Sequence, residues 1–389
     1  MESVDLTPLI NSVLLISAGQ GIFITVLISS RYLHFYPNRF LVGLTTVLSL
    51  TLIHIYLGEK PYYDQLLIRQ LLPNIIFLLG PFHYLYTKYL VWQPKRFQKT
   101  EYLHFAPTLL LLSYGVLQSV GILAPTDFIS AHERSGFIAF NWVYILYSSC
   151  YYVLSVRQLS SYRKRIKDVF SNLEKLKVSW LSTLTYFAIT CHMIFMIENL
   201  FSLIYLNSSG FILSSILSVA YVYSMGYMGI LKSPVLGDRH RNDVLEDMES
   251  TQIGISENQK YEKSGLKPAQ ALQYKKALLH KMESDRVYRD SNLTLRDLAD
   301  LLDVTPHHLS EVINTQTGKN FHDFINSYRV REVINNLADP KKEHLTLLAI
   351  GLDAGFNSKT SFNTIFKKNT GKTPSEYKRQ KMEVALPET

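Results

Sequence analysis

The segment TLLAIGLDAGFNSKTSFNTIFKKNTGKTPSEY, residues 346–377, decides the fold of the C-terminal part of the chain. Thr346 is suited to cap a helix, and apolar residues follow it one and four positions later. Gly355 comes next, at a point where a left-handed backbone would end that helix. The second helix is expected to begin near Ser358 and to have Phe362 on its inward face. The segment therefore predicts two short helices joined by a tight turn.

The same pattern occurs a second time, 52 residues earlier in the chain. Thr294 takes the place of the first cap and Asp303 that of the glycine, and aspartate tolerates a left-handed backbone. Thr305 caps the following helix, and Pro306 occupies its first position. A further amphipathic segment over 321–337 predicts the helix between the two copies. Helix, short turn and helix is the arrangement that places a recognition helix in the major groove of DNA, so the repeat predicts two such motifs.

Residues 293–379 resemble the tandem helix-turn-helix DNA-binding domain of the AraC/XylS family of transcriptional regulators. The resemblance is carried by the motifs GFNS at 355–358, FKK at 366–368 and TGKTP at 370–374. Gly351 departs from the family pattern, which usually has alanine there. The layout of the whole chain is also similar to membrane-bound members of the family with a multi-helix N-terminal region. The resemblance implies an all-α domain that binds double-stranded DNA and regulates transcription in a bacterium.

The resemblance also implies which residues face the DNA bases. Asparagine pairs with adenine, lysine with guanine, and glutamate accepts from cytosine, so polar residues on a recognition helix can specify a sequence. Some residues at these positions are expected to contact only phosphate or solvent. Carried over by position, the base-reading residues are His307, His308, Ser310, Glu311 and Asn314 in the first motif and Lys359, Thr360, Asn363 and Thr364 in the second.

Basic residues accumulate near the end of the chain. Over 359–381, seven lysines and arginines stand against a single acidic residue, Glu376. Such a run can be a solvated surface and nothing more, but its position on and after a recognition helix favours contact with phosphates. Arg329 and Arg331 are further candidates for the same role. The residues that we expect to bind phosphate are Lys367, Lys368, Lys372, Lys378 and Arg379.

The first 237 residues have a very different composition. A helix needs about 20 apolar residues to cross a bilayer, and seven stretches qualify: 9–30, 40–57, 66–86, 102–123, 137–156, 180–206 and 211–231. Pro73 and Pro81 predict a kink in the third stretch. The chain is therefore expected to be all-α, with a seven-helix transmembrane bundle followed by a tandem helix-turn-helix domain. The expected parts are a sensor domain over 1–237, a linker over 238–267, a DNA-binding domain over 268–381 and a C-terminal tail over 382–389.

The basic residues outside these stretches predict the orientation of the chain. Cytoplasmic connections of membrane proteins are enriched in lysine and arginine. The connections 31–39, 87–101 and 157–179 carry 13 such residues, whereas the N-terminus and the connections on the other side carry 2. The N-terminus is thus expected outside and the C-terminal domain in the cytoplasm, with the bundle in the inner membrane of a bacterium.

Only two charged residues fall inside the seven stretches, Arg69 and Glu198. An ionisable residue in a membrane usually faces the bundle interior and marks a functional site, so Glu198 is expected to form a polar site with Arg69 or with His192. The alternative is that Glu198 only specifies helix packing. The histidines of these stretches are spread over several helices without paired spacing, so no metal site is predicted.

The chain of 389 residues has a formal net charge of +8 and only two cysteines, which excludes a disulfide scaffold. No glycine-rich phosphate loop, paired metal ligands or receiver domain can be recognised, so neither an enzyme nor a cofactor is expected. The predicted function is a one-component transcription regulator whose membrane bundle senses a signal. Its expected partners are double-stranded DNA, the lipid bilayer, RNA polymerase, a second copy of the chain and an unidentified ligand or membrane protein. The alternative is a multi-pass transporter or receptor whose helical cytoplasmic tail regulates it or binds protein.

Overall fold

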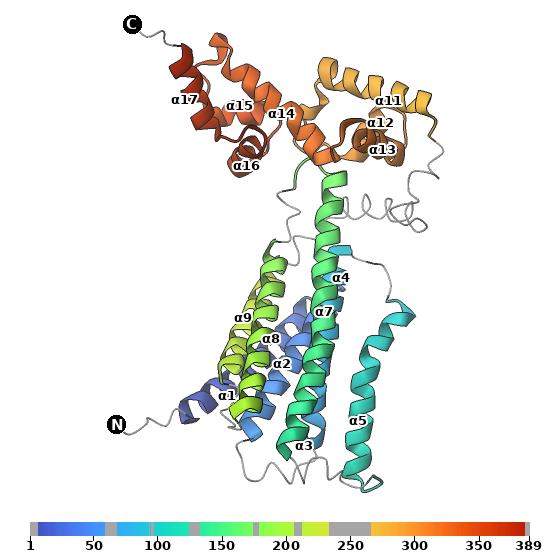
Figure 1. Cartoon of the computed structure of the whole chain (residues 1–389), viewed down its shortest axis with the longest axis vertical. Coiled ribbons are helices and arrows are strands. Elements are labelled where there is room, and N and C mark those ends of the chain that lie inside the picture. Colours follow the sequence, from blue (N-terminus) through green and yellow to red (C-terminus); the bar gives the residue numbers. More distant parts are fainter. Residues whose placement is uncertain are drawn as a thin grey trace. The chain divides into compact units, whose positions relative to one another are not determined.

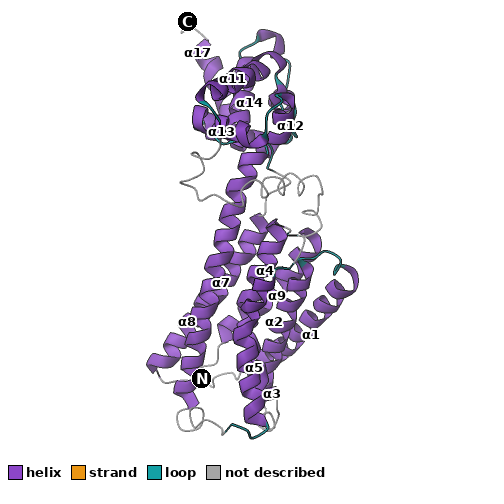
Figure 2. Cartoon of the chain, turned by 90° about the vertical axis from the view of Figure 1, so that its right-hand side faces the viewer, coloured by secondary structure: helices purple, strands orange, loops and turns teal. Residues whose placement is uncertain are grey.

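A computed structural model of the chain describes residues 7–58, 68–92, 94, 97–123, 133–173, 179–205, 212–232 and 266–385. Every regular element within these residues is a helix, as Figure 2 shows, and an isolated antiparallel bridge joins Phe170 to Thr294. The expected linker, up to residue 265, and the last four residues of the expected tail lie outside the described part. The all-helical fold class is therefore confirmed for the residues that the structure describes.

The chain forms two compact units. The first comprises Met1–Tyr162 and Val178–Gly237, and the second comprises Arg163–Lys177 and Asp238–Thr389. The sequence alone places residues 163–177 in a connection of the membrane part. In the structure the described residues of this segment, 163–173, belong to the C-terminal unit instead, because the helix Glu133–Val169 continues well beyond its apolar stretch.

Three helices of the first unit are long and apolar enough to cross a membrane. The qualifying segments are Asn11–Arg31 in α1 (Thr7–Arg31), Asn38–Gly58, which is all of α2, and Ser179–Ile204 in α8 (Ser179–Tyr205). Two further long helices, α7 (Glu133–Val169) and α9 (Ile212–Lys232), cover the fifth and seventh apolar stretches (Figure 1). Length and composition thus support three of the expected spans among the described residues.

The third apolar stretch is interrupted. It begins as α3 (Ile68–Leu71), continues as the 3-10 helix η2 (Leu72–Leu78) and ends in α4 (Leu79–Trp92). Pro73 stands in the first turn of η2, where its ring and its missing N–H disfavour an α-helical hydrogen bond. The predicted kink is therefore present as a change of helix type. The fourth stretch starts in the 3-10 helix η3 (Lys99–Phe105) and continues as α5 (Ala106–Ser119).

The second unit is a bipartite domain built around its longest helix, α14 (Phe321–Leu337). One hydrophobic core, with Leu298 and Phe324, contains the first half of α14, and another, with Val333 and Phe362, contains the second half. Figure 1 shows α14 between the two groups of helices that form these cores. The remaining elements are α11 (Pro268–His280), the π-helical turn η7 (Lys281–Asp285), η8 (Val287–Arg289), α12 (Leu295–Leu301), α13 (Pro306–Thr317), η9 (Pro340–Lys342), α15 (Leu347–Asp353), α16 (Lys359–Thr370) and α17 (Pro374–Ala385).

The three predicted helix caps, Thr294, Thr305 and Thr346, are confirmed, and the structure adds a fourth at Ser358. The side-chain oxygens of Thr294, Thr305, Thr346 and Ser358 each accept a hydrogen bond from the backbone N–H three residues later. Each bond satisfies one of the N–H groups that the first turn of a helix leaves without a partner. The caps therefore define where α12, α13, α15 and α16 begin, and both helix-turn-helix motifs are present as the repeat predicts.

The turns of the two motifs have the left-handed backbone that the sequence predicts. Asp303 has a φ of 55° and Gly355 a φ of 96°. Gly355 also lies against the backbone of η8, since a Cβ atom there would stand 2.5 Å from the carbonyl oxygen of Tyr288. Gly351 is similarly close to α16, because a Cβ atom would stand 2.9 Å from the Phe362 ring. This tight contact explains why a residue smaller than alanine occupies position 351.

Candidate nucleic-acid interface and membrane-unit cavity

The recognition helix of the first motif is α13, and its polar residues lie on the face away from the core. Leu309, Val312 and Ile313 are buried. With 100° between successive residues, His307, Glu311 and Asn314 lie on the opposite side of α13 and Ser310 lies at its edge, and all four are half-buried. The Asn314 amide donates to the Ser310 hydroxyl at 3.4 Å, and the base-reading role of these residues stays a prediction.

His308 lies to the side of this face. Its ring is 6.4 Å from that of Tyr274 in α11, with the two planes nearly parallel. The imidazole is half-buried, and its neighbour His307 is 6.1 Å away between ring centroids. His308, one of the five residues predicted to read bases in this motif, therefore lies beside the outward face of α13, next to α11.

The recognition helix of the second motif is α16, and its outward face is polar and basic. Phe362 and Phe366 are buried, so Thr360, Thr364 and Lys367 project in the opposite direction. Asn363 lies at the edge of this face and is half-buried, whereas Lys359 is exposed in the first turn. The four predicted base-reading residues thus lie outside the core, and Lys367 shares a helix face with two of them.

The predicted phosphate-binding residues surround this helix. Lys367, Lys372 and Arg379 are exposed, and Lys378 is half-buried. Lys368 is different, because its ammonium group is 2.7 Å from the Asp323 carboxylate at the start of α14. The neighbouring Lys368 ammonium and the His322 imidazole hold the pKa of the Asp323 carboxyl below its usual value, although burial opposes this shift. Lys368 therefore links α16 to α14 in addition to any contact with phosphate.

Arg329 does not belong to the surface at all. It is only 1% exposed, and its guanidinium donates to the backbone oxygens of Tyr288 and Asp290, both at 2.7 Å. Burial lowers the pKa of Arg329 to about 10. The suggestion that this arginine contacts phosphate is wrong, because every donor that the contacts define points into the domain. Arg331, two residues later, is exposed and packs over the Tyr328 ring at 5.0 Å.

A short segment after α7 completes the surroundings of Arg329. Ser171 is 1% exposed, its hydroxyl donates to the Leu293 carbonyl at 2.6 Å, and the same hydroxyl accepts from Arg329 at 3.1 Å. The Asn326 amide donates to the Ser171 carbonyl at 3.0 Å, and the Ser171 N–H donates to the Leu293 carbonyl at 3.3 Å. Residue spacing gives no sign of this docking, because the partners stand more than 120 positions apart.

The residues of the expected intramembrane polar site come from two helices, α3 and α8. Glu198 of α8 accepts hydrogen bonds from the backbone N–H groups of Leu213 and Ser214, at 3.0 and 3.3 Å, so it caps the start of α9. Arg69 is exposed in α3. His192 is buried, and its Nε2 atom donates to the carbonyl of Ile145 at 3.1 Å. Glu198 thus joins α8 to the start of α9, and its polar site with Arg69 or His192 stays a prediction.

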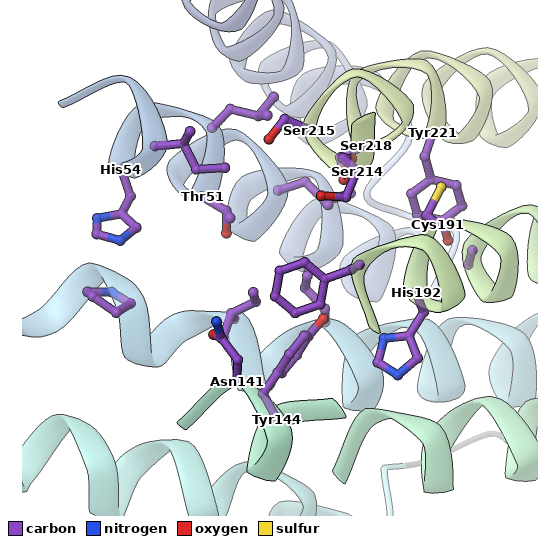
Figure 3. Close-up of a pocket in the computed structure, with 18 of the residues that line it drawn as sticks. Thr51, His54, Asn141, Tyr144, Cys191, His192, Ser214, Ser215, Ser218 and Tyr221 are labelled. Carbon is purple, nitrogen blue, oxygen red and sulfur yellow. Dashed lines mark hydrogen bonds between the residues drawn. The ribbon is translucent and has the colours of Figure 1, made fainter. Parts of the chain in front are cut away.

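A cavity of about 310 Å³ lies in the first unit, and His192 is part of its wall. Side chains from α2, η2, α4, α7, α8 and α9 enclose it. On one side the His83 imidazole is hydrogen-bonded to the Tyr221 hydroxyl at 2.8 Å and to the Thr185 hydroxyl at 3.2 Å. Its polar lining, most of it labelled in Figure 3, includes Thr51, His54, Asn141, Tyr144, Cys191, His192, Ser214, Ser215, Ser218 and Tyr221. Within the described residues, no three metal-ligating side chains are grouped closely enough to hold an ion.

Comparison with known proteins identifies the C-terminal unit only. Residues 298–380 match the family model of a helix-turn-helix domain, which is of the AraC type. An uncharacterized transcriptional regulatory protein of Bacillus subtilis (strain 168), YesN, is 30% identical over 90 residues. These residues are 23% of this chain and 24% of that protein, so the chain matches about a quarter of the relative's length. No solved structure matches the chain. The chain therefore carries a helix-turn-helix DNA-binding domain of the AraC type.

Proposed function

We propose that the protein is a membrane-embedded one-component transcription regulator. Its C-terminal domain binds promoter DNA sequence-specifically, and its membrane unit senses a signal that changes transcription. The observation that carries the proposal is the combination, in one chain, of two helix-turn-helix motifs with outward polar faces and three helices able to cross a membrane. The proposed action involves no catalytic step and requires no cofactor.

In this proposal α13 and α16 enter successive segments of the major groove, about 34 Å apart. Asn314 and Asn363 are suited to adenine, Lys359 to guanine, and Glu311 to cytosine. The basic residues on and after α16 bind the phosphates that flank the second segment, and they supply affinity that does not depend on sequence. The bound promoter would then be read by RNA polymerase, and a second copy of the chain would extend the contact to a repeated site.

The membrane part is proposed to cross the bacterial inner membrane seven times, with the N-terminus outside. The support is the asymmetry of 13 basic residues against 2 between the two sets of connections. DNA is available only in the cytoplasm, so this orientation is also the one that a DNA-binding C-terminal unit requires. The signal is proposed to be a ligand of the bundle or a membrane protein that packs against it.

Sequence-specific binding can be tested with the full chain in lipid nanodiscs. Fragments of genomic DNA are mixed with the nanodiscs, and the retained fragments are sequenced. We expect a small set of fragments with a common motif, and Asn363→Ala should lose preference at one position of it. Asn335→Ala is the matched control, because Asn335 is exposed on α14 and stands on neither recognition helix. Retention without any common motif would contradict the proposal.

The second candidate is a transporter or receptor whose helical tail regulates it or binds protein. The cavity in the first unit favours this reading as much as it favours a sensor. Transport of a solute into sealed vesicles, together with failure to retain DNA, would establish this alternative.

A further inference from the structure

We propose that the cavity of the first unit binds a small uncharged molecule with an apolar body and a few hydrogen-bonding groups. The inference rests on the proposed function, because the molecule bound in the cavity would be the signal that the regulator senses. Binding itself is a property of the first unit and can be measured without DNA. The two proposals can therefore fail separately.

The helices around the partly open cavity give the site its size. Long helices from distant parts of the sequence surround it, and its volume is about 310 Å³. Ligand pockets begin at roughly 300 Å³, so the ligand is small. A molecule in this position contacts several helices at once. Because these helices pack on one another, the ligand stabilises one arrangement of the bundle over others.

The interrupted helix in the cavity wall is a second, independent sign of a binding site. Leu72, Pro73 and Ile76 of η2 line the cavity, so the 3-10 segment forms part of its surface. Irregular backbone at membrane depth is tolerated where it is buried in protein or lines a cavity. Discontinuous helices also form the binding sites of several transporter folds. The interruption therefore coincides with the place where a ligand would be held.

The chemistry of the wall selects an uncharged ligand. Its polar groups, among the residues that the structure describes, are hydroxyls, an amide, a thiol and imidazoles, and none is a carboxylate, an ammonium or a guanidinium. A charged molecule would lose its hydration without meeting an opposite charge. Most of the rest of the wall consists of leucine, isoleucine and phenylalanine side chains, which suit an apolar body.

The test uses matched probes on the purified full chain in detergent. Benzyl alcohol and 2-naphthol are the neutral probes, and benzoate and 2-naphthoate are their charged counterparts. Thr51→Phe fills the cavity from α2, and Ser218→Leu fills it from α9. Thr46→Phe is the control, since Thr46 is on α2 outside the cavity lining and, like Thr51, hydrogen-bonds to the carbonyl four residues earlier. The melting temperature of the first unit is measured against probe concentration.

We expect at least one neutral probe to raise the melting temperature in a dose-dependent way, and the charged probes to leave it unchanged. Both filling variants should remove this shift, and Thr46→Phe should retain it. Equal shifts with charged probes, shifts that survive in a folded filling variant, or no shift up to the solubility limit would each overturn the inference. Retention of DNA by the same samples is recorded separately, so a negative result here leaves the proposed DNA binding intact.

A second inference rests on contacts within the second unit. We infer that the segment Phe170–Ser171 is the point through which α7 controls the arrangement of the two helix-turn-helix motifs. The linker over 238–267 then serves only as a tether. This inference also rests on the proposed function, because its effect is read as regulated transcription.

The docked segment contacts both sides of the domain through Arg329. Phe170 pairs with Thr294, the cap of α12, so the segment touches the first motif directly. The Ser171 hydroxyl binds Arg329, and Arg329 in turn binds the carbonyl of Tyr288. That carbonyl lies against Gly355, the turn of the second motif. A displacement of the segment would therefore shift Thr294, the cap in the first motif. Through Arg329 and Tyr288 it would also shift Gly355, the turn of the second motif.

Continuity of the chain makes α7 a suitable lever. It is a single helix from Glu133 to Val169, so it begins in the first compact unit and ends in the second. A continuous helix transmits displacement along its axis. Buried polar contacts such as those of Ser171 and Arg329 also have few alternative arrangements, because each lost partner leaves an unsatisfied group.

The test compares variants in the full chain within cells. Expression from a promoter recovered by the DNA selection is measured under the growth conditions that give the unaltered chain its highest and lowest output. Ser171→Leu removes the docking contact, and Ser161→Leu, at an exposed site on α7, is its control. A Gly-Ser-Gly insertion after Tyr162 interrupts α7, and the same insertion after Gly254 lengthens the linker. DNA affinity of each chain is measured in nanodiscs.

We expect Ser171→Leu and the α7 insertion to bring the ratio of the two outputs close to one, with the DNA Kd changed by less than about threefold. Ser161→Leu and the linker insertion should keep the ratio of the unaltered chain. A preserved ratio in Ser171→Leu, or a ratio lost only on insertion into the linker, would overturn the inference. Loss of DNA binding in both α7 variants would also overturn it, since the segment would then only support the fold.

Discussion

Gly355 provides the sharpest test of how the two motifs are held together. Its φ of 96° lies where side chains are strained, and a Cβ atom would stand 2.5 Å from the Tyr288 oxygen and 2.8 Å from the Arg289 Cα. Both neighbours are backbone atoms, so neither can rotate away. Gly371, which ends α16, also has a left-handed backbone with a φ of 77°, but a Cβ atom there would meet nothing within 4 Å. A comparison of alanine substitutions at Gly355 and Gly371 therefore separates the cost of backbone strain from the cost of close contact.

The expected magnitudes follow from this difference. Gly371→Ala should cost about 1–2 kcal/mol, which is the strain of a left-handed alanine. Gly355→Ala carries the same strain and, in addition, overpacking worth about 1–3 kcal/mol, so its total should be about 2–5 kcal/mol. The excess should appear around Gly355 and in η8, because these are the segments that must separate.

Amide hydrogen exchange on the full chain measures both costs in place. Peptides from α15 and α16 and from η8 should exchange faster in Gly355→Ala, with opening about tenfold more frequent for each 1.4 kcal/mol. In Gly371→Ala the increase should be smaller and confined to the end of α16. Equal acceleration in the two variants, or no acceleration in η8, would refute the packing of the second turn against the first motif.

Three further predictions concern DNA and the membrane. Lys367→Ala combined with Lys372→Ala should flatten the slope of log affinity against log salt by about 1.8, as measured by fluorescence anisotropy; an unchanged slope would mean that neither lysine contacts phosphate. Asn363→Ala should cost about 1–3 kcal/mol at one base pair and leave other positions unaffected, whereas uniform weakening across sequences would reject base reading. A reporter enzyme fused after residue 130 should be active outside the cell and one fused after residue 170 inside, and the opposite pattern would invalidate the orientation.

Local signals explain what the sequence reveals about the C-terminal unit. A cap such as Thr305 or Ser358 acts on an N–H three residues away, and the turn at Asp303 or Gly355 requires only its own backbone angle. Interactions of this range depend only on residues that are close together in the sequence. The helix boundaries of both motifs, and the outward positions of their polar residues, could therefore be predicted before any tertiary structure was known.

Contacts between distant residues could not be predicted in the same way. Arg329 looks like a surface arginine on an amphipathic helix, and only the carbonyls of Tyr288 and Asp290 make its burial possible. The docking of Ser171 depends on a helix that continues beyond its apolar stretch. Glu198 stands out in the sequence as a charged residue in an apolar stretch, but its partners in α9 depend on the packing of the two helices.

The central claim, that a membrane-embedded chain binds specific promoters, is tested most directly by mapping DNA bound to the protein in living cells. The tagged full chain is cross-linked to DNA in the cells and recovered from the membrane fraction. The DNA that is recovered with it is then sequenced. We expect discrete genomic sites that share one motif and that are lost when Asn363→Ala and Lys367→Ala are combined. Recovery of no enriched DNA from the membrane fraction, or of the same DNA with the double variant, would contradict the account.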